Sequence, residues 1–114
     1  MDNELEKICF EYSPEKNSFL KKIRNISFEE IELIIEEGKG VLDIIAHPNS
    51  SKYPNQKIYV LNINAYIYLV PFVQKSKYEI FLKTIFPSRK LTKKYLSSIG
   101  VISYEQTKSK KKKD

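Results

Sequence analysis

The chain has 114 residues, of which 41% are hydrophobic and 30% are charged, and its formal net charge at pH 7 is +6. This length predicts one domain with a buried core. One cysteine and one histidine are too few for an internal disulfide or a Cys/His zinc site. With three glycines and no Walker or GxGxxG loop, the sequence predicts no nucleotide cofactor and no metal.

No apolar run approaches the roughly 20 residues of a membrane span, and no apolar segment follows the start. We therefore expect no signal peptide, no membrane association and a cytoplasmic location. The charge is unevenly divided: residues 1–47 carry a net charge of −5, and residues 48–114 carry +11. This asymmetry indicates that one face of the protein contacts a polyanion such as nucleic acid.

The N-terminal segment predicts a short strand over residues 8–12, in which Cys9 is a small buried residue. Ser13 is a suitable N-cap and Pro14 a suitable first helical residue. The helix should extend to about residue 24. Its apolar face is expected to comprise Phe19, Leu20 and Ile23.

A second helix follows, with Ser27 and Glu30 at the spacing of a capping box and Gly38 as its stop signal. Apolar side chains recur at helical spacing, at Phe28, Ile31, Ile34 and Ile35. The glutamates on the other face are more simply explained as a solvated surface than as general acids and bases.

Four further strands are predicted, over residues 41–45, 57–63, 66–73 and 79–86. Asn64 and Ala65 suit a two-residue hairpin turn that places Ile63 opposite Tyr66. One hairpin face is then rich in tyrosine. We expect the other face to point to the core, with Ile58, Val60, Ile67 and Leu69.

After Pro87, Ser88 can cap a last helix to about residue 97, which Gly100 closes. The lysine-rich tail 107–114 is expected to be disordered, leaving residues 1–106 as the domain. The order β-α-α-β-β-β-β-α predicts an α+β fold, with two N-terminal helices and a C-terminal helix packed on an antiparallel sheet.

The last predicted helix has a compact cationic face. At about 100° per residue, four of its cations fall within an arc of roughly 140°: Arg89, Lys90, Lys93 and Lys94. Lys83 precedes them on the adjoining strand. Cations at this density bind phosphates, although a solvated lysine face is the simpler alternative.

The only histidine, His47, opens a polar loop that also contains Lys52 and Tyr53. Histidine is the usual proton-transfer group near neutral pH, and tyrosine can stack on a base. A lone histidine is more often structural. His, Lys and Arg side chains nevertheless suffice for RNA cleavage without a metal.

Two segments resemble the BrnT-type toxins, which are RelE-like. The first runs from Phe10-Glu-Tyr-Ser-Pro-Glu-Lys-Asn17 through Ser27-Phe-Glu-Glu30, and the second is Phe86-Pro-Ser-Arg-Lys-Leu-Thr-Lys-Lys-Tyr95. The resemblance implies a RelE-like fold and a ribonuclease toxin of a type II toxin–antitoxin pair. It also implies a cognate antitoxin, of the ribbon-helix-helix kind, and leaves open a homodimer within the complex.

On this basis Arg89 is expected to clamp the scissile phosphate, with Lys90, and His47 to transfer a proton. Positioning of the RNA is assigned to Lys83, Lys93, Lys94, Lys52 and Tyr53. The chain departs from the family at Arg24-Asn25 and at Ala46, where we expect glutamate in the relevant subgroup, so Ala46 is a candidate inactivating substitution. The alternative function is a non-catalytic module that binds nucleic acid or an acidic partner through the same basic face.

Overall fold

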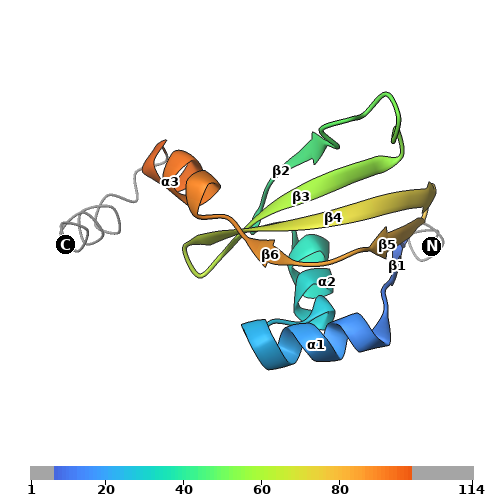
Figure 1. Cartoon of the computed structure of the whole chain (residues 1–114), viewed down its shortest axis with the longest axis horizontal. Coiled ribbons are helices and arrows are strands. Elements are labelled where there is room, and N and C mark those ends of the chain that lie inside the picture. The colour runs from blue at the N-terminus through green and yellow to red at the C-terminus, as the bar shows by residue number, and fades with distance from the viewer. Residues whose placement is uncertain (1–6, 99–114) are drawn as a thin grey trace.

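A six-stranded sheet with two helices on one face dominates the computed structural model, which describes residues 7–98 (Figure 1). The elements are β1 Cys9–Glu11, α1 Pro14–Arg24, α2 Phe28–Glu37, β2 Val41–Ala46, β3 Gln56–Ile63, β4 Tyr66–Ser76, β5 Glu79–Leu82, β6 Phe86–Pro87 and α3 Arg89–Ser98. The α+β class is thus confirmed. The predicted tail 107–114 and the stop at Gly100 lie outside the described residues.

The sheet has the strand order β1-β5-β4-β3-β2, and β6 pairs with β4. The prediction of a fully antiparallel sheet is wrong at one edge, because β1 pairs in parallel with β5. The two helices carry the chain from β1 to the far edge at β2. No hairpin therefore forces β1 to be antiparallel to its neighbour.

The last predicted strand is divided into β5 and β6. Beyond the Phe72–Leu82 pair, the Lys83 amide donates to the carbonyl of Pro71 at 2.8 Å. Pro71 has no N–H to return, so the ladder stops there. The chain then rejoins β4 further along, where Phe86 lies opposite Leu69.

The predicted hairpin turn is confirmed. Ile63 pairs with Tyr66 and Tyr59 with Val70. Asn64 and Ala65 have φ of 53° and 65°, so both central residues adopt the left-handed region, as in a type I′ turn.

The prediction of which hairpin face is buried in the main core is wrong. The tyrosine-bearing face lies beneath α1 and α2, and its buried members include Tyr59, Leu61, Val70 and Phe72. Tyr59 stacks on Phe72 with ring centroids 4.3 Å apart, so the ring contributes apolar area to the core. The opposite face forms a smaller cluster around Val60 and Ile67.

The predicted helix caps are confirmed. Ser13 caps α1 by accepting from the Lys16 amide, and Ser27 and Glu30 form the capping box of α2. Gly38 ends α2 with φ of 78°, which favours glycine.

Two burial predictions near the N-terminus are wrong. Phe19 and Ile23 are each 51% exposed, and only Leu20 of the predicted face is buried, because α1 turns Asn17 and Leu20 toward the core. Cys9 is exposed. Its neighbours Ile8 and Phe10 pack on the core, and alternation along a strand directs Cys9 the other way.

Candidate nucleic-acid interface

The C-terminal helix α3 is attached to the free backbone of β4 through its first turn. The Ser88 amide donates to the Ile67 carbonyl at 2.9 Å. The Thr92 hydroxyl accepts from the Ile67 amide at 2.8 Å and donates to the Ser88 carbonyl at 2.7 Å. Thr92 is fully buried, so this pair of contacts sets where α3 lies on the sheet.

One side of α3 packs on the smaller apolar cluster, with Leu91 and Tyr95 against Val60 and Ile67. The Tyr95 hydroxyl also donates to Oδ2 of Asp43 at 3.3 Å. Burial, and then the charge and hydrogen bond of Asp43, raise the pKa of Tyr95. Because these groups lie between α3 and β2, they leave the opposite side of the helix to solvent.

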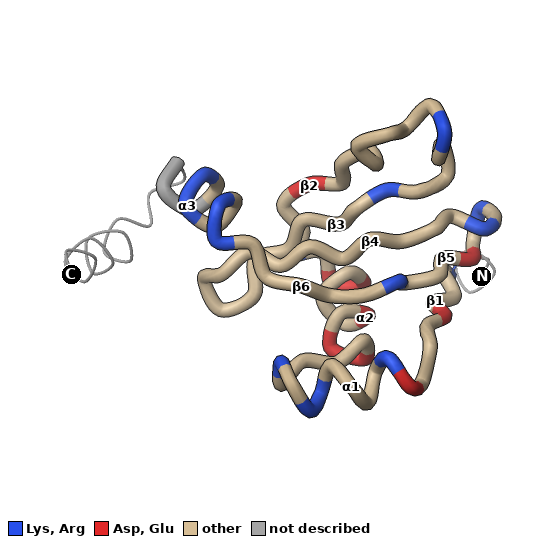
Figure 2. The backbone as a smooth tube through the Cα atoms, in the orientation of Figure 1, with Lys and Arg blue, Asp and Glu red and all other residues tan. Residues whose placement is uncertain are grey.

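That outer side carries the cationic face predicted from the sequence, which we call the α3 cationic face: Arg89, Lys90, Lys93 and Lys94. All four side chains are exposed. Within residues 7–98, no carboxylate forms an ion pair with any of them. Figure 2 shows blue segments and no red segment on the described part of α3.

The start of α3 adds to this positive potential. Ser88 caps the helix, because its hydroxyl oxygen accepts from the Leu91 amide at 3.2 Å. The amides of Arg89 and Lys90 have no acceptor among the described residues. Free amides and the helix dipole both favour an anion at the position where the Arg89 side chain begins.

His47 lies in a different cluster, in the loop between β2 and β3. Its Nδ1 accepts from the Asn49 amide at 2.9 Å. Its ring centroid lies 4.8 Å from that of Tyr53, and the Lys52 ammonium lies 5.4 Å from the Tyr53 ring centroid. This hydrogen bond uses Nδ1 as an acceptor for the loop backbone and so holds the ring within the loop.

Lys83 belongs to the same end of the sheet as this loop. Its ammonium donates to Oε1 of Gln56 at 3.3 Å, and the Gln56 carbonyl accepts from the His47 amide at 3.3 Å. The structure therefore gathers His47, Lys52, Tyr53 and Lys83 at one end, which we call the loop cluster.

The loop cluster and the α3 cationic face are not brought together. Ile67, which anchors α3, pairs with Asn62, whereas His47 is bonded to Gln56. Gln56 and Asn62 are six residue steps apart on β3, which corresponds to about 20 Å. His47 and Arg89 thus occupy opposite ends of the sheet.

Ala46 ends β2 directly before His47, and it pairs with Lys57 on β3. Both side chains are exposed. A glutamate at position 46 would face the Lys57 ammonium across the strand pair. The candidate inactivating substitution at Ala46 therefore lies beside the loop cluster and not on α3.

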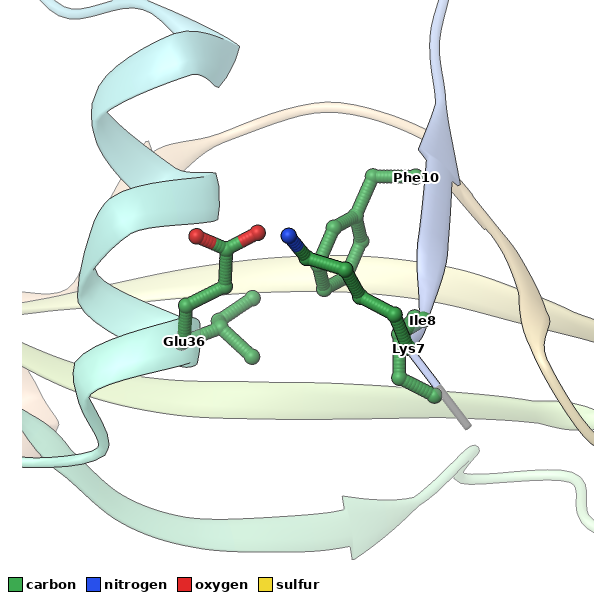
Figure 3. A pocket seen from close by; sticks show the side chains of 5 residues that line it. Lys7, Ile8, Phe10 and Glu36 are labelled. Atoms are coloured by element: carbon green, nitrogen blue, oxygen red, sulfur yellow. The ribbon is translucent and has the colours of Figure 1, made fainter. Parts of the chain in front are cut away.

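An apolar hollow of the described surface lies away from both the loop cluster and the α3 cationic face. Lys7, Ile8, Phe10, Ile35 and Glu36 line this hollow of about 390 Å³ between β1 and α2, where Lys7 points toward Glu36 (Figure 3). It contains none of the site residues predicted from the sequence.

The sequence analysis did not predict the roles of Thr92 and Asp43, which position α3. The only available signal was a threonine on the apolar arc of the last helix.

Comparisons with family models, curated proteins and solved structures gave no match to this chain.

Within residues 7–98, no three His, Cys, Asp or Glu side chains are placed to hold a metal ion. In that same part of the chain, no helix has both the length and the apolar character needed to cross a membrane.

Proposed function

We propose that this protein binds RNA through the α3 cationic face and acts as a toxin of a type II toxin–antitoxin pair. The observation that carries the proposal is the set of four exposed cations that pair with no carboxylate among residues 7–98, on a helix fixed to the sheet by the buried Thr92 hydroxyl. Such a face binds phosphates by releasing counterions. The resemblance to BrnT-type toxins supplies the toxin assignment.

Metal-independent RNA cleavage is the activity that the resemblance implies. In this proposal Arg89 and Lys90 bind the scissile phosphate, with the free amides at the start of α3. Arginine suits this role because its planar guanidinium makes paired contacts to phosphate oxygens.

The position of His47 favours the non-catalytic alternative. A general base must lie within hydrogen-bond reach of the proton it removes, and His47 lies about 20 Å along the sheet from the anchor of α3. One phosphate does not reach both. The loop cluster instead offers a second contact, where Tyr53 stacks on a base and Lys52 and Lys83 meet the backbone.

The partner expected for this surface is an antitoxin with an acidic or amphipathic segment that covers the α3 cationic face in a cytoplasmic complex. Complementary charge favours such an encounter. Binding of RNA and of the antitoxin would then exclude each other.

The test is RNA binding and cleavage by the full chain at several salt concentrations. We expect Lys90→Glu with Lys93→Glu to weaken binding and to flatten the slope of log affinity against log salt. Lys77→Glu, in the turn between β4 and β5 at the other end of the sheet, should change binding little, and Lys90→Glu alone is compared with it so that each protein carries one charge reversal. An equal loss of RNA affinity in the α3 variant and in the Lys77→Glu control would overturn the assignment of RNA binding to the α3 cationic face.

Cleavage is scored separately with labelled RNA and by growth after induction, using the chain and its Ala46→Glu variant. Product and growth arrest with either protein would support the endoribonuclease. Intact RNA and normal growth with both, together with retained binding, would establish the non-catalytic module instead.

A further inference from the structure

Helix α1 exposes an apolar pair that is left uncovered by the part of the chain that the structure describes. Phe19 and Ile23 lie one turn apart and are each 51% exposed. Lys16 lies 5.9 Å from the Phe19 ring centroid, and Lys22 is exposed beside them. Neither lysine pairs with a carboxylate among the described residues. This face, with Phe19, Ile23, Lys16 and Lys22, is called the α1 face.

Helix α2 exposes an apolar side chain in an acidic setting. Leu33 is 58% exposed and lies one turn from both Glu30 and Glu37 on the same side of the helix. Within its ten residues, α2 carries acids and no base. Burial raises the pKa of Glu32, and the nearby charges of Glu36 and Glu29 raise it further.

A groove of about 770 Å³ adjoins this side of α2 and extends to the β3–β4 hairpin. Glu30, Leu33, Ile34 and Glu37 line it from the helix, and Ile63, Tyr66 and Tyr68 line it from the sheet. Polar groups complete the lining, namely Arg24, Asn25 and Asn64. The groove thus combines apolar side chains with two carboxylates and one guanidinium, and its excess of negative charge suits an apolar side chain flanked by cations. This surface is called the α2 groove.

We propose that a second copy of this chain occupies the α2 groove, so that the α1 face of each protomer docks into the α2 groove of the other. Phe19 and Ile23 are the anchors, and Lys16 and Lys22 meet the carboxylates of Glu30 and Glu37.

A second copy is favoured because one protomer carries both complementary surfaces on the same side of its sheet. In Figure 2, blue segments predominate along α1, apart from a red segment at its start, and red segments mark α2. In a dimer with a two-fold axis, the α1 face of each protomer contacts the α2 groove of its partner. The interface then contains two sets of lysine–glutamate pairs and buries Phe19 and Ile23 of both protomers. α3 packs on the other face of the sheet, so the dimer leaves the α3 cationic face open.

The first test is sedimentation of the nuclease-treated full chain over a wide concentration range at low and high salt. We expect a monomer–dimer equilibrium that is weaker at high salt. Phe19→Asp and Leu33→Asp should each weaken dimerisation by about 10-fold or more. Both side chains are half exposed, and a thermal melt verifies that each variant folds. Ile44→Asp on β2, where Ile44 is 49% exposed, is the control and should dimerise normally.

The second test reverses the charges. A variant with Lys16→Glu and Lys22→Glu and another with Glu30→Lys and Glu37→Lys should each remain monomeric, because both contacts become repulsive. Glu30→Lys also removes the capping-box acceptor of the Ser27 amide, so a thermal melt and a single Glu37→Lys variant verify that the loss of the dimer does not come from unfolding. Mixed together, they should form a heterodimer, because every α1 face then meets an α2 groove of opposite charge. A monomer at all concentrations, loss of the dimer in the Ile44→Asp control, or no heterodimer on mixing would each overturn the proposal.

Discussion

The side chain of Asn17 on α1 accepts a hydrogen bond from the Phe28 amide at 2.8 Å, where α2 begins. Its amide nitrogen also donates to Oε1 of Glu29 at 2.9 Å. Asn17 is buried, and Phe28 stacks on Tyr12 with ring centroids 4.8 Å apart. These contacts join α1 to α2, so the polar side chain of Asn17 has a structural role at the junction of the two helices.

Asn17→Ala should therefore destabilise the fold, because it leaves the buried Phe28 amide without an acceptor. We expect a loss of about 1–3 kcal/mol in the free energy of unfolding, measured by urea denaturation. Ser18→Ala, an exposed neighbour on the same helix, is the control. Equal stability of the two variants would contradict the role assigned to Asn17.

The same contact predicts a pH effect at Glu29. The hydrogen bond from Asn17 is the largest cause that lowers the pKa of Glu29 from its ordinary 4.5, and Lys21 contributes by its charge. A carboxyl with a lowered pKa stabilises the fold above its ordinary value, and this contribution is lost as the pH falls through the folded pKa. A carboxyl NMR titration should show the lowered pKa and its rise in Asn17→Ala. An unchanged titration in that variant would remove Asn17 as the cause.

The hairpin turn predicts a stabilising substitution. Ala65 has φ of 65°, a conformation that costs an L-residue with a side chain about 1–2 kcal/mol and glycine much less. Ala65→Gly should raise the free energy of unfolding by about 0.5–1 kcal/mol, since the entropic cost of glycine offsets part of the gain. Ala65→Val should lower it. Thermal melts of the three proteins test the order, and a less stable glycine variant would contradict it.

Thr92→Val tests how α3 is held. The substitution keeps the shape but leaves the buried Ile67 amide without the acceptor that lies at 2.8 Å. We expect a loss of about 1–3 kcal/mol and faster hydrogen exchange at Ile67. Thr92→Ser retains the hydroxyl and should preserve the protection of that amide. Slow exchange at Ile67 in Thr92→Val would show that α3 is held by other contacts.

Arg89 offers the sharpest test of chemistry on the α3 cationic face. In the proposed endoribonuclease, Arg89→Lys would keep the charge but lose the paired contacts to phosphate, so RNA cleavage should fall by about 10-fold or more, equivalent to about 1.4 kcal/mol. Arg89→Ala should reduce cleavage further with little change in melting temperature, because the side chain is exposed. Normal cleavage by both variants, measured with labelled RNA, would leave Arg89 outside the site.

Local signals in the sequence determined much of the secondary structure. Ser13, Ser27 and Gly38 delimit the first two helices because caps depend on neighbouring backbone groups. Asn64 and Ala65 also act locally, because a two-residue turn fixes which residues of β3 and β4 lie opposite each other. The amphipathic division of α3 also follows from spacing alone.

Only the tertiary structure decided which surface each element meets. Both hairpin faces carry enough apolar side chains to be buried, and the placement of α1 and α2 selected the tyrosine-bearing face. The parallel pairing of β1 with β5 joins residues about 70 apart in the chain, which no local pattern encodes. The separation of His47 from Arg89 has the same origin: both lie beside sheet ends, and strand order and register, rather than residue type, determine which end each one occupies.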